Sequence, residues 1–127
     1  MSCGGRHHPT DDMPHLTLEY TADLPRGVVS RQLFARLHHI VVEVTGADIE
    51  NCKSRSIEHG NFLVGESSDG AGFVHLEVRI LEGRTRDVKT ELGRRLLGAL
   101  RDTCDSAGWD AQVTVEVRDI SRDHYFK

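Results

Sequence analysis

The sequence has no long run of apolar residues. Its longest apolar stretches are 40–42 and 96–100, and the second is interrupted by Gly98. Both are far shorter than the roughly 20 residues that a helix needs to span a bilayer. The first residues also lack the basic start and apolar core of a secretory signal. We therefore expect no membrane-spanning segment and predict a cytoplasmic location.

Cysteine is scarce, and no metal-binding pattern is present. Cys3, Cys52 and Cys104 lie far apart without the spacing of metal ligands, so reduced thiols are expected. The 8 histidines show no zincin or zinc-finger spacing, and the adjacent His38 and His39 cannot share one face of a helix. We predict no metal, no cofactor and no cysteine nucleophile.

An excess of positive charge is absent as well. The 127 residues include 16 Lys and Arg against 20 Asp and Glu, and the basic residues do not form one run. Nucleic acid is therefore not an expected partner. The glycine-rich stretch 60–72 lacks the order of a phosphate-binding loop, which argues against nucleotide binding. A chain of this length with 38% hydrophobic residues is typical of one domain.

The first half of the chain contains a strand, a helix and a less certain extended segment. Alternating residues from His15 to Tyr20 predict a half-buried strand. Apolar residues at steps of three and four then predict an amphipathic helix over 29–44, ended by Gly46. We expect one strand or two short strands between Asn51 and Gly65, broken near His59-Gly60, and a loop over 66–72.

The second half repeats this order. Residues 73–80 alternate more clearly than any others and predict a strand. Thr85 is well placed to cap a helix, which ends at Gly108. The valines of 113–117 alternate with polar residues in a last strand, which a tail over 119–127 follows.

These elements form two β-α-β units in tandem. We predict an α+β (α/β) fold with two helices on one face of a four-stranded mixed sheet. The other face has no cover within the chain, and Tyr20, Phe73 and Trp109 need it, so we predict association through sheet faces or edges. Residues 13–127 form this domain. Residues 1–12 are interpreted as a disordered leader, a cloning remnant or an over-long start, with no role in the fold.

The segment Met13-Pro14-His15 precedes the first strand directly. If translation starts at Met13 and the methionine is removed, the nitrogen of Pro14 becomes a free secondary amine at the start of a strand. Such an amine can act as a general base. While residues 1–12 remain attached, the same nitrogen is an amide without basicity.

Five short motifs occur in a characteristic order and spacing. They are Met-Pro-His at 13–15, Lys-Ser-Arg at 53–55, Phe-Val-His at 73–75, Gly-Arg-Thr at 83–85 and Tyr-Phe-Lys at 125–127. Together they resemble the 5-carboxymethyl-2-hydroxymuconate isomerase family over residues 14–127. This family belongs to the tautomerase superfamily, with 4-oxalocrotonate tautomerase and macrophage migration inhibitory factor.

The resemblance implies a cofactor-independent isomerase that assembles as a homotrimer with inward-facing sheets. The implied activity is that of a 5-carboxymethyl-2-hydroxymuconate delta-isomerase, which turns a dienol of a small polycarboxylic acid into an unsaturated ketone during homoprotocatechuate degradation. The implied catalytic residues are Pro14, as the base, and Arg84, which would bind a carboxylate or stabilise the dienolate oxygen. Lys53 stands where the family has an arginine and lacks its planar fork, so Arg55 is a further substrate-binding candidate.

Other interpretations stay open. The same fold also serves other small-acid tautomerases, decarboxylases and hydratases, because the pocket lining decides the reaction. A catalytically silent trimeric binding protein is expected if Pro14 is not the free amino terminus. Taken without the resemblance, Pro14 is a strand-edge proline and Arg84 a solvated arginine before a helix.

Overall fold

The computed structural model describes residues 12–66 and 72–127. Its elements, in chain order, are β1 (His15–Thr21), α1 (Arg31–Thr45), η2 (Ile49–Asn51), β2 (Lys53–His59), β3 (Phe73–Leu81), α2 (Arg86–Ser106), β4 (Gln112–Ile120) and η3 (Arg122–His124). Most of the loop expected over 66–72 and the leader up to residue 11 lie outside the described residues. Within the two described stretches, neither helix combines the length and the apolar character that crossing a bilayer requires.

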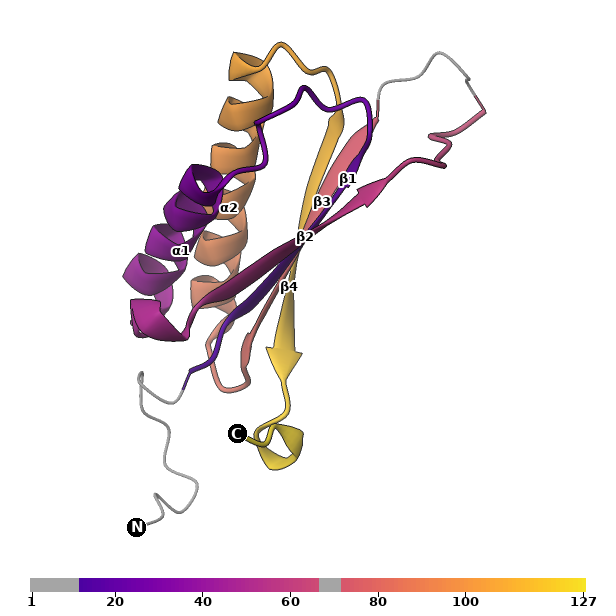
Figure 1. The fold of residues 1–127 in the computed structure, drawn as a ribbon. Helices are drawn as coiled ribbons and strands as arrows, with labels where there is room; N and C mark the ends of the chain where they lie inside the picture. Colours follow the sequence, from indigo (N-terminus) through magenta and orange to yellow (C-terminus); the bar gives the residue numbers. More distant parts are fainter. Residues whose placement is uncertain (1–11, 67–71) are drawn as a thin grey trace.

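The four strands form one mixed sheet in the order β2-β1-β3-β4. β1 is parallel to β2, β3 is parallel to β4, and the two pairs meet antiparallel between β1 and β3. Both helices lie side by side on one face of this sheet, and no helix of the described residues covers the opposite face (Figure 1). The predicted fold of two β-α-β units is therefore confirmed.

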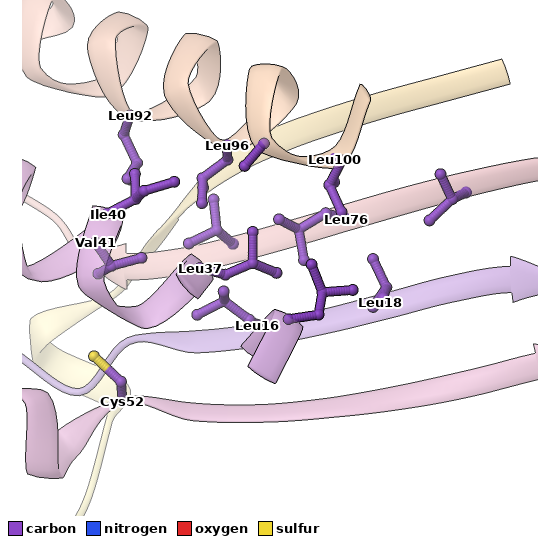
Figure 2. Close-up of a cluster of buried hydrophobic side chains, with 14 of the residues drawn as sticks. Leu16, Leu18, Leu37, Ile40, Val41, Cys52, Leu76, Leu92, Leu96 and Leu100 are labelled. Carbon is purple, nitrogen blue, oxygen red and sulfur yellow. The ribbon is translucent and has the colours of Figure 1, made fainter. Parts of the chain in front are cut away.

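The core lies between the helices and the sheet. Its side chains come from alternate positions of β1 and β3 and from one stripe of each helix, and Figure 2 shows them converging in the space between these elements. The fully buried members include Leu16, Leu37, Leu76, Leu92 and Leu96. Burying each such side chain stabilises the fold by roughly 1.5–3 kcal/mol relative to leaving it exposed. The alternation seen in the sequence thus turns one face of each strand toward the helices.

The helix ends follow local capping rules. Ser30 precedes α1 with extended backbone, and its Oγ accepts a hydrogen bond from the Leu33 N–H at 3.3 Å, so Val29 lies before the helix rather than in it. Gly46 ends α1 in the left-handed conformation with φ 76°. Thr85 caps α2 as predicted, since its Oγ1 accepts from the Val88 N–H. α2 ends at Ser106, slightly before the predicted Gly108.

The uncertain segment between Asn51 and Gly65 contains one strand, β2. It pairs with β1 from Lys53 opposite His15 to His59 opposite Thr21, and it stops where β1 stops. The Ala22 N–H donates to the His59 carbonyl at 2.9 Å and closes the pairing. Residues 62–64 therefore do not extend this strand, because no further length of β1 is available to them.

The prediction that Trp109 needs cover from a partner was wrong. Trp109 is only 7% exposed, and its Nε1–H donates to Asp23 Oδ2 at 2.9 Å. Tyr20 is half-buried and packs against the core. Phe73 is half-buried on the sheet face without helices, where its ring lies 6.2 Å from that of His59. Trp109 therefore gives no support for association.

The packing predicts unequal effects for two neighbouring leucines of α2. Leu96 is fully buried in the core, whereas Leu97 is half-buried and lies outside that cluster. Leu96→Ala should lower the free energy of unfolding by about 2–5 kcal/mol, because it removes core contacts and leaves a cavity. Leu97→Ala, with the same change in helix propensity, should cost about 1 kcal/mol or less. Denaturant unfolding at one fixed protein concentration measures both, and equal losses would contradict this packing.

Candidate active site

Pro14 lies at the start of β1, where the sheet holds its backbone. The residue is buried, and its carbonyl accepts a hydrogen bond from the Lys53 N–H at 3.0 Å. Because β1 is parallel to β2, the first residues of both strands lie at the same end of the sheet. Pro14 therefore has a fixed position next to the first residues of β2.

His15 joins this end of the sheet to the end of the chain. Arg55 donates from its guanidinium Nη2 to His15 Nδ1 at 3.0 Å, and His15 Nε2 lies 2.8 Å from the Tyr125 hydroxyl. Arginine can only donate, so Nδ1 must be the acceptor and the ring proton must be on Nε2. The imidazole is therefore neutral, and its Nε2–H donates to Tyr125 Oη.

Positive charge dominates the surroundings of His15. Burial lowers the pKa of His15 below its ordinary value of 6.5, and repulsion by Arg55, Lys53 and Arg79 lowers it further. In the sheet register Arg79 lies directly opposite His15, and Lys53 lies opposite it on the other side. A second ionisable amine at this end of the sheet would meet the same cations.

Arg84 lies in the turn between β3 and α2, where it pairs with an acidic residue of the amino-terminal segment. Its guanidinium contacts Asp12 Oδ2 in an ion pair, and Asp12 Oδ1 accepts a hydrogen bond from the Leu81 N–H at 3.1 Å. Asp12 has no exposed surface, and the side chain of Arg84 is 16% exposed. A carboxylate is thus held between a backbone N–H and the Nη2 of an arginine.

The four site residues from the sequence are arranged in two parts. Lys53 and Arg55 lie on one face of β2, and Lys53 Nζ donates to the Asn51 carbonyl at 3.3 Å. Together with Pro14 they form the first part. Arg84 forms the second part, at the end of β3, and Asp12 connects it to the segment that leads into Pro14.

Sequence reasoning did not assign a role to Asp12, His15 or Tyr125. His15 and Tyr125 belong to the motifs at 13–15 and 125–127, which was the available signal. Asp12 is one of two adjacent aspartates in a polar stretch, and nothing in the sequence distinguishes it. The prediction that residue 12 has no role in the fold is wrong, because its carboxylate is buried and hydrogen-bonded.

The two described cysteines are unsuited to nucleophilic chemistry. Cys52 and Cys104 are both free and buried. Burial, and then the charge of Asp12, raise the pKa of the Cys52 thiol to about 11, and burial also raises the pKa of Cys104. In the part of the chain that the structure describes, no three His, Cys, Asp or Glu side chains gather in a way that could hold a metal ion.

Exposed cations lie at the Pro14 end of the sheet. Lys53, Arg55 and Arg79 are all exposed, and they lie around His15, the residue after Pro14. A hollow bordered by Trp109 and Thr114 lies at the opposite end of the sheet, where β4 begins. The exposed cations can therefore attract an acid to the Pro14 end of the sheet.

A comparison with models of known protein families gives a match over most of the chain. The family model described as 5-carboxymethyl-2-hydroxymuconate isomerase matches residues 14–127. A comparison with curated proteins finds no match. The matched range begins at Pro14, the residue on which the site geometry is centred.

Solved structures with the same fold include isomerases. The 5-carboxymethyl-2-hydroxymuconate isomerase from Deinococcus radiodurans R1 is 28% identical, with a TM-score of 0.81 over 91% of this chain and 89% of that one. A fused wild-type 4-OT symmetric trimer is 23% identical, with a TM-score of 0.72 over 89% of this chain and 90% of that one. A 5-carboxymethyl-2-hydroxymuconate delta-isomerase is 16% identical, with a TM-score of 0.71 over 91% and 86%. The last two likenesses concern the fold alone.

The cation cluster predicts how His15 titrates. In the wild-type chain its pKa should lie below 6.5, and Arg55→Ala should raise it, because one of the charges that repel the imidazolium is removed. A histidine NMR titration measures both values. Arg101→Ala, which removes an exposed arginine of α2, should leave the His15 pKa unchanged. An unchanged pKa in Arg55→Ala would contradict the contact with Arg55.

Proposed function

Because this chain belongs to the 5-carboxymethyl-2-hydroxymuconate isomerase family of the tautomerase superfamily, we propose that it isomerises an unsaturated hydroxy or oxo polycarboxylic acid by proton transfer, in the breakdown of aromatic compounds. The chain is an isomerase. The proposal adds which residue acts as the base, which residues bind the anionic groups, and how the chains assemble. The observation that carries it is the buried Pro14 at the start of β1, beside cations that already lower the pKa of His15.

Pro14 is the proposed base in a chain that begins at this residue. Its carbonyl is held by the Lys53 N–H, so the ring and the free nitrogen would have little freedom to move. Burial disfavours a charged ammonium, and the neighbouring Lys53 and Arg55 repel it. Both effects lower the pKa of a prolyl amine toward neutral pH, where a base can accept a proton and return it.

The reaction then needs no cofactor, because the same proton is removed and returned. The prolyl nitrogen takes the hydroxyl proton of a dienol, and negative charge develops on the resulting dienolate oxygen. The prolyl ammonium then delivers the proton to a carbon of the conjugated system, which leaves an unsaturated ketone. The base is regenerated, and the product contains the same atoms as the substrate.

Cationic side chains would bind the acid groups and the developing charge. Arg84 already holds a carboxylate, that of Asp12, so its fork is oriented to bind one. Lys53 and Arg55 are exposed on the face of β2 next to Pro14 and would attract a second acid group. Lys53 supplies a point charge without a planar fork, which favours a substrate that differs from that of family members with an arginine here.

We also propose a homotrimer in which the sheet faces without helices meet. A fused 4-OT of the same fold is a symmetric trimer. In this chain, charged side chains on the sheet face without helices already pair with one another: Arg118 contacts Glu77 at 3.1 Å, and His59 contacts Glu19 at 2.8 Å. Phe126, next to Tyr125, is 84% exposed and would gain cover from a neighbouring subunit.

The prolyl-base proposal predicts large losses of activity for two substitutions. Protein made from Met13, with an intact mass that shows a start at Pro14, should ketonise 2-hydroxymuconate-type dienols, as followed by their ultraviolet absorbance. Pro14→Ala should lower kcat/KM at least about 10²-fold, because the positioned secondary amine is lost. Arg84→Ala should lower it about 10²–10³-fold, because a donor to the developing charge is lost.

Arg101→Ala serves as the matched control, since Arg101 is an exposed arginine at the far end of α2. It should leave kcat/KM unchanged. If Pro14→Ala retained full activity, the prolyl base would be refuted while the family assignment stayed. Activity toward a different small acid would instead favour another reaction of the same fold.

The trimer proposal predicts a mass of about three times the 14.2 kDa chain in light scattering. The mass should persist across a tenfold dilution, because an interface that completes an active site needs to be stable at working concentrations. A mass of one chain would refute the trimer, and a mass of two chains would point to pairing through the strand edges.

A further inference from the structure

Asp12 occupies the anion-binding position of Arg84. One carboxylate oxygen accepts the Leu81 N–H at 3.1 Å, and the other forms the ion pair with the Arg84 guanidinium. Asp12 has no exposed surface, and it comes two residues before Pro14. The side chain is therefore a built-in ligand of the arginine proposed for catalysis.

The sheet register explains why Asp12 reaches this position. β1 and β3 are antiparallel, with His15 opposite Arg79. Continuing this pairing backward along β1 and forward along β3 brings the residues before Pro14 beside the end of β3. Leu81 and Arg84 lie there, so Asp12 meets them through the same pairing that positions Pro14.

The chemistry of this contact is that of a bound acid ligand. An anionic carboxylate is held by a charged arginine and a backbone N–H, which are the donors that a substrate carboxylate would use. Arg84 retains further capacity, because its buried Nε has no hydrogen-bond partner among the described residues. Asp12 itself contacts Arg84 through Nη2, so a free acid could take that nitrogen only after Asp12 has left.

We propose that Asp12 is an internal competitor that fills the carboxylate site of Arg84 for as long as residue 12 remains attached to Pro14. Removal of residues 1–13 would then activate the enzyme in two ways, because it frees the nitrogen of Pro14 and empties the carboxylate site. This inference rests on the proposed function for the role of Arg84 in substrate binding, and it deepens that function by adding its regulation.

Attachment makes Asp12 an effective competitor. A group tethered by a short segment has an effective concentration in the millimolar range, without any loss of translational freedom on binding. An external acid must displace it, so the apparent Kd equals the intrinsic Kd divided by the fraction of sites that Asp12 leaves free. We expect a weakening of at least about tenfold.

The test measures binding by the full chain, in which Pro14 remains acylated and no turnover can interfere. The probe is cis,cis-muconate, a conjugated dicarboxylate, titrated calorimetrically at constant ionic strength. Asp12→Asn keeps an oxygen for the Leu81 N–H but removes the charge that holds Arg84. It should bind the probe at least about tenfold more tightly than the wild-type chain. Asp12→Ala should do the same, and circular dichroism checks that both variants are folded.

Asp110→Asn is the matched control, because it makes the same change in net charge at an exposed aspartate of the α2–β4 connection. It should bind the probe as the wild type does. Adding Arg84→Ala to Asp12→Asn should abolish the gain, which ties the effect to Arg84. Equal affinity of wild type and Asp12→Asn would overturn the proposal, and so would an equal gain in Asp110→Asn.

A comparison of two wild-type chains keeps the proposal testable if the Asp12 variants do not fold. The full chain should bind muconate at least about tenfold more weakly than the chain that begins at Pro14, and equal affinities would overturn the proposal. The outcomes also separate this inference from the proposed function. A Pro14-initiated chain that binds muconate but catalyses nothing refutes the prolyl base alone. Catalysis by that chain, with no effect of Asp12→Asn on binding by the full chain, refutes the competitor alone.

Discussion

The pairing of β1 with both of its neighbours is the constraint on which the site depends. β1 lies between β2, which is parallel to it, and β3, which is antiparallel. At one end of the sheet this pairing gathers the start of β1, the start of β2 and the end of β3. Pro14, Lys53 and the Leu81–Arg84 turn therefore meet at one place although they are far apart in sequence. The core beneath β1 fixes this arrangement, because Leu16 and Leu18 are almost fully buried.

The positive charge at this end of the sheet lowers the pKa of one residue, His15. His15 is kept neutral by burial and by three cations, and its proton is held on Nε2 by Arg55 and Tyr125. The environment that disfavours an imidazolium also disfavours a prolyl ammonium, and it attracts acids. Among the described residues, the buried Asp12 carboxylate supplies the negative charge that pairs with Arg84. The same potential would serve the proposed base, its substrate and the proposed internal ligand.

Much of the fold was predictable because it depends on local periodicity. The alternation over 15–20 and 73–80 and the steps of three and four in both helices give the elements, and two β-α-β units permit few topologies. The end of β2 was less predictable, since it depends on where its partner β1 stops. Trp109 was misjudged for a related reason. Its cover comes from Asp23, 86 residues away, and from the core.

The sequence by itself determined the strands, the helices, the family and the candidate residues Pro14, Lys53, Arg55 and Arg84. These follow from spacing along the chain and from short motifs, which are local properties. Only the tertiary structure decided that Asp12 contacts Arg84 and that His15 links Arg55 to Tyr125. Those contacts join residues 40 to 110 positions apart, and strand register and chain direction set them. A side chain's partner across a sheet is fixed by folding as a whole, so a lone aspartate in a polar segment carried no sign of its burial.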